Sequence, residues 1–204
     1  GVSVSGQTVA DQLAAQFPEI KMVGDNPLLR PGIVHRLDKD TSGVMVVARN
    51  QETFDILKGL FKTRKIEKIY HAIACGVLKK SRGIISFPIG RVIKNPLKRG
   101  INHEGKKIIR GAREAHTEYR VLKAGKNFSL VELKPRTGRM HQLRVHLKAI
   151  GNPIACDRIY GGKNVCCPMG AARQLLHAQS LSFTLHGTIL SFEADPPEAF
   201  RCVP

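Results

Sequence analysis

The chain is short of acidic and aromatic residues. Its 204 residues contain no tryptophan, and aromatic side chains make up only 5% of them. Asp and Glu number 16 against 33 Lys and Arg, so the formal net charge is +17 at neutral pH. A protein with this charge attracts polyanions, and nucleic acid is the partner class that the charge favours. The alternative is a basic surface that only maintains solubility, although a net charge of about 2–8 already serves that purpose.

The cysteines are few and show no recognisable spacing. There are five of them, an odd number, and no two form a Cys-x-x-Cys pair. The sequence therefore supports neither a disulfide framework nor a zinc ribbon, and a reducing compartment fits best. No apolar run approaches the ~20 residues of a membrane span, and the sequence shows no signal-peptide pattern. We expect a cytoplasmic monomer that uses no metal and no cofactor.

Apolar periodicity and capping residues predict a mixture of helices and strands. Helices are expected to begin at Thr8, at Asn50 and after Gly138, and the third should carry Met140 and Leu143 on its apolar stripe. Strands are expected at 44–48, 69–74, 84–86, 116–122, 128–134, 179–185 and 188–193.

The segment 90–111 is the most basic part of the chain. It holds seven Lys and Arg residues against one acidic residue, Glu104. Its glycines and its charge predict a mobile loop, which is either a solvated hairpin tip or an arm that contacts RNA.

The segment 32–43 is the first candidate for chemistry. It places His35, Arg36 and Asp38 in a short turn between two apolar runs. A carboxylate beside a guanidinium group is stabilised in its charged form, and a charged carboxylate can act as a nucleophile or stabilise a cationic sugar centre. Asp38 is the candidate for that role. The alternative is a purely structural aspartate that caps the loop or pairs with Lys39.

The second candidate is the start of the third helix. Arg139 and Arg144 stand there, and a helix start with arginines favours an anion, either an RNA phosphate or a catalytic carboxylate. The alternative is a pair of arginines on a solvated helix face. Tyr70 lies in an apolar strand, where a lone tyrosine is more often a core residue than a site residue.

These residues carry a resemblance to a known family. The run Pro-Gly-Ile-Val-His-Arg-Leu-Asp-Lys-Asp-Thr-Ser-Gly at 31–43 resembles the signature of the RluA-type pseudouridine synthases, which isomerise uridine in RNA. Further similar segments follow in the family's order at 68–72, 136–146, 151–154, 157–161 and 176–178.

The resemblance implies an α+β fold, in which helices and loops flank a bent, mainly antiparallel sheet with a central RNA-binding cleft. It assigns the catalytic aspartate to Asp38. It assigns to Tyr70 the tyrosine that stacks on the target base and is implicated in proton removal. The arginine that pairs with the aspartate is placed at Arg144, with Arg139 as the competing choice. Arg36 matches the arginine that helps to displace the target nucleotide.

The expected partner is ribosomal or transfer RNA, with the target uridine flipped out of its stack. The expected RNA-binding residues are His35, Arg36, Lys62, Arg64, Lys65, Arg91, Arg139 and His141. We expect residues 1–204 to form one catalytic domain, with Gly1 at the end of a turn whose preceding strand is absent, and without the S4-type RNA-binding domain of many relatives. The alternative function is a non-catalytic RNA-binding or ribosome-assembly module on the same scaffold.

Overall fold

The computed structural model describes residues 8–102, 107–163 and 165–202, so the expectation for Gly1 lies outside the described residues. The chain divides into two compact units. The first unit comprises Gly1–Leu37, Met45–Ile66 and Ser182–Leu190. The second unit comprises Asp38–Val44, Glu67–Leu181 and Ser191–Pro204.

The first unit contains the first two predicted helices, α1 (Val9–Gln16) and α2 (Gln51–Lys62), joined through a short 3-10 helix, η1 (Pro18–Met22). Thr8 caps α1 in a reciprocal capping box, and the side chain of Asn50 accepts a hydrogen bond from the third residue of α2. Both predicted helix starts are therefore confirmed. The predicted apolar face of α1 is not buried, because Val9 at its start is 56% exposed.

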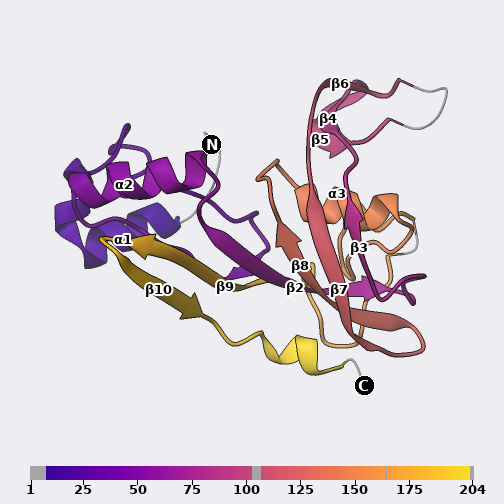
Figure 1. The fold of residues 1–204 in the computed structure, drawn as a ribbon. Helices are drawn as coiled ribbons and strands as arrows, with labels where there is room; N and C mark the ends of the chain where they lie inside the picture. Colours follow the sequence, from indigo (N-terminus) through magenta and orange to yellow (C-terminus); the bar gives the residue numbers. More distant parts are fainter. Residues whose placement is uncertain (1–7, 103–106, 164, 203–204) are drawn as a thin grey trace. The chain divides into compact units, whose positions relative to one another are not determined.

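The described residues contain a mixed sheet of seven strands (Figure 1), and all of its residues except those of β9 and β10 within Ser182–Leu190 belong to the second unit. The order is β1 (Ser42–Gly43), β9 (Leu176–Leu185), β2 (Glu67–Cys75), β8 (Phe128–Pro135), β7 (Thr117–Ala124) and β3 (Arg82–Ile85), and β10 (Thr188–Glu193) pairs with β9. β1 runs parallel to β9, whereas β8 runs antiparallel to β2 and β7. With its helices this sheet belongs to the α+β class, as expected.

The core of the second unit lies between this sheet and α3 (Gln142–Ala149). Leu143 and Leu147 of α3 pack against the buried face of β8, where Val131 and Leu133 are fully buried. Fully buried and half-buried residues alternate along β8 from Phe128 to Lys134, as in a strand with one face on the core. Met140 was expected on the same apolar stripe, but it precedes the helix and is 46% exposed.

The segment predicted as a mobile loop is mostly ordered sheet. β4 (Ile89–Val92) pairs with both β5 (Asn95–Gly100) and β6 (Ile109–Arg113), and residues 103–106 lie outside the described part. A Cβ atom on Gly90 would lie 2.7 Å from the carbonyl oxygen of Arg110, so this glycine permits a close approach of strands. The loop prediction was wrong because it took glycine and charge as signs of flexibility.

The predicted strand at 44–48 is also wrong. Regular strand pairing in this part of the chain is confined to Ser42–Gly43. Backbone N–H groups of the residues that follow donate to acceptors outside a regular strand pair. Within the second unit, the Val44 N–H donates to the carbonyl of Ala178, and within the first unit the Val46 N–H donates to Nε2 of His35. A side-chain acceptor thus takes the place of a strand partner, which an apolar run does not reveal.

Four cysteines form two disulfides, Cys75–Cys166 and Cys156–Cys167. The expectation that the cysteines support no disulfides is therefore contradicted. The partners are 91 and 11 residues apart in sequence, and they meet because the loop after α3 folds back onto the end of β2. Linear spacing could not show this convergence. Among the described residues, no helix is long and apolar enough to cross a lipid bilayer.

Candidate active site

Arg144 joins two carboxylates in the second unit. Its Nη1 donates to Oδ2 of Asp38 at 3.3 Å, while Nε and Nη2 donate to the two carboxylate oxygens of Asp157 at 2.7 and 2.9 Å. Asp157 is fully buried, and the side chain of Arg144 is only 6% exposed, but that of Asp38 is 22% exposed. The carboxylate of this trio that remains open to a ligand is therefore that of Asp38.

The charges of the two carboxylates hold the guanidinium group in its protonated form. Burial by itself opposes the charge, but the hydrogen bonds and charges of Asp157, together with those of Asp38, raise the pKa of Arg144. The bidentate contact also fixes the plane of the guanidinium group. Asp157 thereby leaves one nitrogen of Arg144 aimed at Asp38.

The loop that carries Asp38 is held on its C-terminal side. The carbonyl of Asp38 accepts a hydrogen bond from the Thr41 N–H, and the Thr41 hydroxyl accepts one from Gln174 at 2.9 Å. β1 follows and runs beside β9, where a Cβ atom on Gly43 would lie 2.1 Å from the carbonyl oxygen of Ala178. Only glycine fits this approach, and its φ of +116° also favours glycine. This contact, five residues after Asp38, helps to position the carboxylate.

His141 lies beside Asp38 in an unusual backbone conformation. It has a φ of 57° and directly precedes α3, so it is in the left-handed region that non-glycine residues rarely adopt. Its Nδ1 is 2.8 Å from the Tyr160 hydroxyl, and its Nε2 is 3.9 Å from Oδ1 of Asp38. Burial lowers the pKa of His141, although the charge of Asp38 opposes the shift. Such strain at a cluster of polar groups is typical of functional sites.

The start of α3 is held by a buried hydrogen-bond network centred on Gln142. Its side-chain carbonyl accepts from the Thr137 hydroxyl and the Arg139 N–H, and its amide donates to the Thr117 hydroxyl. A fully satisfied network of this kind fixes local geometry. It therefore sets the position from which His141 and Arg144 extend toward Asp38.

Tyr70 lies on β2, opposite Leu133 of β8, and packs against the core beneath α3. Burial, with a further contribution from the charge of Asp38, raises the pKa of Tyr70 to about 12. At neutral pH its ring is therefore a neutral phenol, which suits contact with a flat uncharged group.

Among the predicted RNA-binding residues, His141 is the one that lies in this cluster. Arg139 is half-buried, and its Nε donates to the carbonyl of Glu114 at 3.0 Å. The arginine in contact with Asp38 is thus Arg144. In the first unit, His35 stacks on Phe61 with ring centroids 4.6 Å apart. The predicted residues of the first unit that are exposed are Arg36, Lys62, Arg64 and Lys65.

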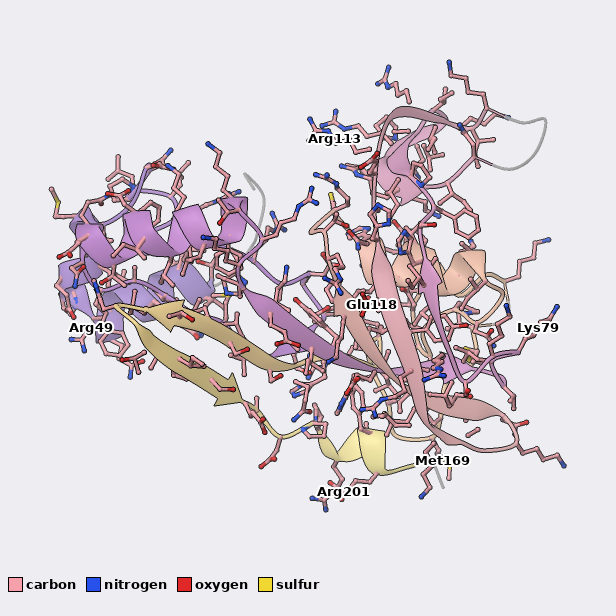
Figure 2. All side chains as sticks on the ribbon, viewed as in Figure 1. Arg49, Lys79, Arg113, Glu118, Met169 and Arg201 are labelled. Atoms are coloured by element: carbon pink, nitrogen blue, oxygen red, sulfur yellow. A yellow bond between two sulfur atoms is a disulfide. The ribbon has the colours of Figure 1, made fainter. Side chains whose placement is uncertain are left out.

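Arg91 belongs to a row of arginines on the three-stranded sheet. Its register partners are Arg99 on β5 and Arg110 on β6, and residues opposite one another in an antiparallel pair share a face. β4, β5 and β6 contain no Asp or Glu within their bounds. Figure 2 shows the basic side chains of this sheet and labels Arg113 on β6. Like charges opposite one another are destabilising, so this row favours a bound polyanion.

Sequence reasoning missed the roles of Asp157 and Tyr160. Both lie in the segment 157–161, which was noticed as part of the resemblance but given no role. The signal in the sequence was an acid and a tyrosine close to Gly161. In the structure, a Cβ atom added to Gly161 would lie 2.6 Å from the carbonyl oxygen of Asp157, so the turn is tight. That tight turn places both side chains toward the start of α3.

The chain is similar to several known proteins. Residues 1–149 match the family described as RNA pseudouridylate synthase. A relative from Aquifex aeolicus, described as an uncharacterized RNA pseudouridine synthase, is 38% identical over 206 residues, which cover 96% of this chain and 62% of the relative. Ribosomal large subunit pseudouridine synthase D of Pseudomonas aeruginosa is 35% identical over 205 residues, which cover 95% of this chain and 60% of the relative.

Among solved structures, human RNA Pseudouridylate Synthase Domain Containing 1 is similar, with a TM-score of 0.78 and 32% sequence identity. The match covers 93% of this chain and 74% of the human chain. The chain therefore spans most of that solved structure, whereas it spans about 60% of the length of the two curated relatives.

Proposed function

Because the chain belongs to the RNA pseudouridylate synthase family, we propose that it isomerises uridine to pseudouridine in RNA. The observation that carries the proposal is the contact between Asp38, whose carboxylate is partly open to solvent, and the buried Arg144. A carboxylate held in this way can react with a sugar or a base. The positive charge of Arg144 stays paired with the buried carboxylate of Asp157.

The isomerisation needs one nucleophile and one proton acceptor. The bond between N1 of uracil and C1′ of ribose breaks, the base turns, a bond forms between C5 and C1′, the proton on C5 leaves, and N1 takes up a proton, so the product is an isomer of the substrate. Asp38 is the proposed carboxylate that starts this sequence, by attack at C1′, by assisting a glycal or by adding to the base. In each route the same carboxylate is released at the end, so the reaction needs no redox partner, metal or cofactor.

Tyr70 is the proposed stacking residue for the target base, and the group implicated in removing the C5 proton. Its pKa of about 12 makes the free phenol a poor base at neutral pH. One of the causes of that shift is the charge of Asp38. Burial is the larger cause and remains throughout, so only in a route that bonds the Asp38 carboxylate to the substrate is the smaller contribution removed and the pKa of Tyr70 lowered part of the way toward its ordinary value.

RNA binding is proposed for the exposed arginine row of β4, β5 and β6, together with Arg139, His141 and the predicted basic residues of the first unit. Contacts of these cations with phosphate would offset the few kcal/mol that flipping a uridine out of its stack costs. In this proposal Arg36 helps to displace the target nucleotide. The name of the Pseudomonas aeruginosa relative favours ribosomal RNA as the first substrate to test, with transfer RNA as the second.

The proposed location is the cytoplasm, where such RNA is found, and the proposed state is a monomer. Disulfides are rare in that compartment. Both disulfides of the structure would have to form in spite of the reducing conditions there, so their presence in isolated protein bears directly on the location.

The proposed activity is tested by tritium release from RNA transcribed with uridine labelled at C5. The protein is expected to release tritium, and Asp38→Asn, which keeps the shape of the side chain but removes its charge, is expected to abolish the release. Filter binding with the same RNA is the control, and both proteins should bind it. Equal release by the two proteins would refute the role of Asp38. Retained binding without release by either protein would favour a non-catalytic RNA-binding module.

A further inference from the structure

The Tyr160 hydroxyl connects the three-stranded sheet to His141. It accepts a hydrogen bond from the backbone N–H of Arg99 on β5 at 3.0 Å, and it lies 2.8 Å from Nδ1 of His141. The Tyr160 side chain is almost fully buried, so neither contact can be replaced freely by water. The Tyr160 oxygen, which belongs to the loop after α3, thus contacts one group from β5 and one group from the start of α3.

We propose that Tyr160 is a positioning residue, which donates its hydroxyl proton to Nδ1 of His141 and thereby keeps an N–H at Nε2 facing Asp38. This inference rests on the proposed function, because it assigns His141 to the reaction started by Asp38. Tyr160 itself touches neither the substrate nor Asp38 in this assignment, and it acts through the imidazole ring.

The hydrogen-bond arrangement around Tyr160 favours this tautomer. The Arg99 N–H can only donate, so the Tyr160 oxygen accepts there and its own proton remains available for His141. In the opposite tautomer, Nδ1–H would donate to the same oxygen, and the hydroxyl proton would lose its acceptor at His141. Burial lowers the pKa of His141, so a neutral ring with one N–H is the form that has to be oriented.

The charge of Asp38 favours the same tautomer from the other side of the ring. Nε2 lies 3.9 Å from Oδ1 of Asp38, which is too long for a hydrogen bond but close enough for a strong electrostatic effect. An N–H at Nε2 is attracted to the carboxylate, whereas a lone pair there is repelled. With Arg144 on Oδ2, the two carboxylate oxygens then face two different donors.

This arrangement gives His141 a use in the reaction. A small movement of the imidazole would close the 3.9 Å gap to a hydrogen bond when RNA binds, since hydrogen bonds at catalytic sites often tighten only in the complex. The N–H would then steer the carboxylate toward one face of the ribose. The ring of Tyr160 has a separate task, because Cζ of Arg144 lies 5.0 Å from its centroid in a cation–π contact.

Tyr160→Phe separates the two tasks, because it removes the hydroxyl and keeps the ring under Arg144. The matched control is Tyr119→Phe, which removes a hydroxyl from a partly buried tyrosine of β7 that packs on the core beneath α3, apart from the cluster that contains Tyr160. We expect Tyr160→Phe to lower kcat for tritium release by about three- to tenfold, the equivalent of one hydrogen bond. Tyr160→Phe also removes the acceptor of the Arg99 N–H, so KM is measured beside kcat, and the fall in kcat should exceed any rise in KM. A rise in KM without a fall in kcat would show that the hydroxyl serves the arginine row rather than His141. Tyr119→Phe should change neither constant.

A double-mutant cycle tests whether the effect passes through His141. In a His141→Gln background, Tyr160→Phe is expected to cause no further loss of kcat, because the group that it orients is already absent. A further loss of full size would show that the hydroxyl acts independently of His141 and would overturn the assignment.

The tautomer itself is read by NMR of protein labelled with 15N at its histidine rings, without any need for activity. His141→Gln identifies the His141 signals among the eight histidines. We expect the Nε2–H tautomer in the wild type and its loss or mixing in Tyr160→Phe. An Nδ1–H tautomer in the wild type, or an unchanged tautomer in the variant, would overturn the proposal. If the wild type released no tritium, the proposed function would fail while the NMR result still decided the tautomer.

Discussion

Asp157 and Tyr160 lie three residues apart in one turn, and each holds a different neighbour of Asp38. The carboxylate of Asp157 binds Arg144 through two hydrogen bonds and also accepts the backbone N–H groups of Ile159 and Tyr160. The side chain of Tyr160 binds His141. One turn therefore sets both groups that face the proposed nucleophile, and a change in its backbone would displace both.

Asp157→Asn is expected to lower stability strongly. The substitution leaves Arg144 with a buried positive charge and without its fully buried partner, and breaking such a pair typically costs about 3–5 kcal/mol. Urea unfolding followed by circular dichroism measures the loss. The control is Glu118→Gln, which breaks an exposed pair with Arg136 and should cost at most about 1 kcal/mol. Equal losses in the two variants would show that Arg144 does not depend on Asp157.

Acid is expected to destabilise the protein through its buried histidines. Burial lowers the pKa of His146, whose side chain is fully enclosed, and it also lowers the pKa values of His71 and His141. The unfolded chain takes up protons near the ordinary value of 6.5, while the folded protein does so only at lower pH. The stabilisation is thus complete above 6.5 and is lost as the pH falls from 6.5 toward the lowered folded values.

This pH effect is measured as the free energy of unfolding in urea at about pH 7.5 and about pH 5.5. The value should be smaller at the lower pH. His146→Gln should make the dependence shallower, even if its stability at neutral pH is lower, because one titrating group is gone. A stability that stays constant or rises toward acid would contradict the assignment of these histidines as buried neutral groups.

The sequence named two residues, Asp38 and Arg144, that the structure brings into contact, and it described the backbone around them less well. Asp38, Tyr70 and Arg144 could be named because they lie in short motifs, and their catalytic roles stay predictions. The strand β8 could be named because its side chains alternate between the two faces of a sheet. The strand at 44–48 failed because its N–H groups bind partners far along the chain, including the ring of His35.

Other errors have the same origin. The two disulfides join residues that are 91 and 11 positions apart, and the hydrogen bond between Tyr160 and Arg99 joins residues that are 61 positions apart. Neither spacing nor composition contains this information, because it depends on how the loop after α3 folds over the sheet. The sheet at β4, β5 and β6 was mistaken for a loop for another reason, because its glycines and charges were taken as signs of flexibility.

The disulfides predict a specific count of free thiols. Cys75, Cys156, Cys166 and Cys167 account for four of the five cysteines in the sequence. Alkylation in denaturant of protein purified without reductant should therefore label a single cysteine, and labelling after reduction should reach all five. Five labelled cysteines before reduction would contradict both bridges. Peptide mass spectrometry then distinguishes these pairings from other ones.

The arginine row predicts how salt affects RNA binding. If Arg91 and Arg110 contact phosphates, each releases counterions on binding, so Arg91→Gln and Arg110→Gln should each reduce the slope of log K against log salt by about one. The loss should be similar for RNAs of different sequence, because phosphates carry no base information. Arg120→Gln is the matched control, since Arg120 is an exposed arginine already paired with Glu132 on the larger sheet. An unchanged slope in both row variants, or an equal change in Arg120→Gln, would show that general charge rather than this row binds the RNA.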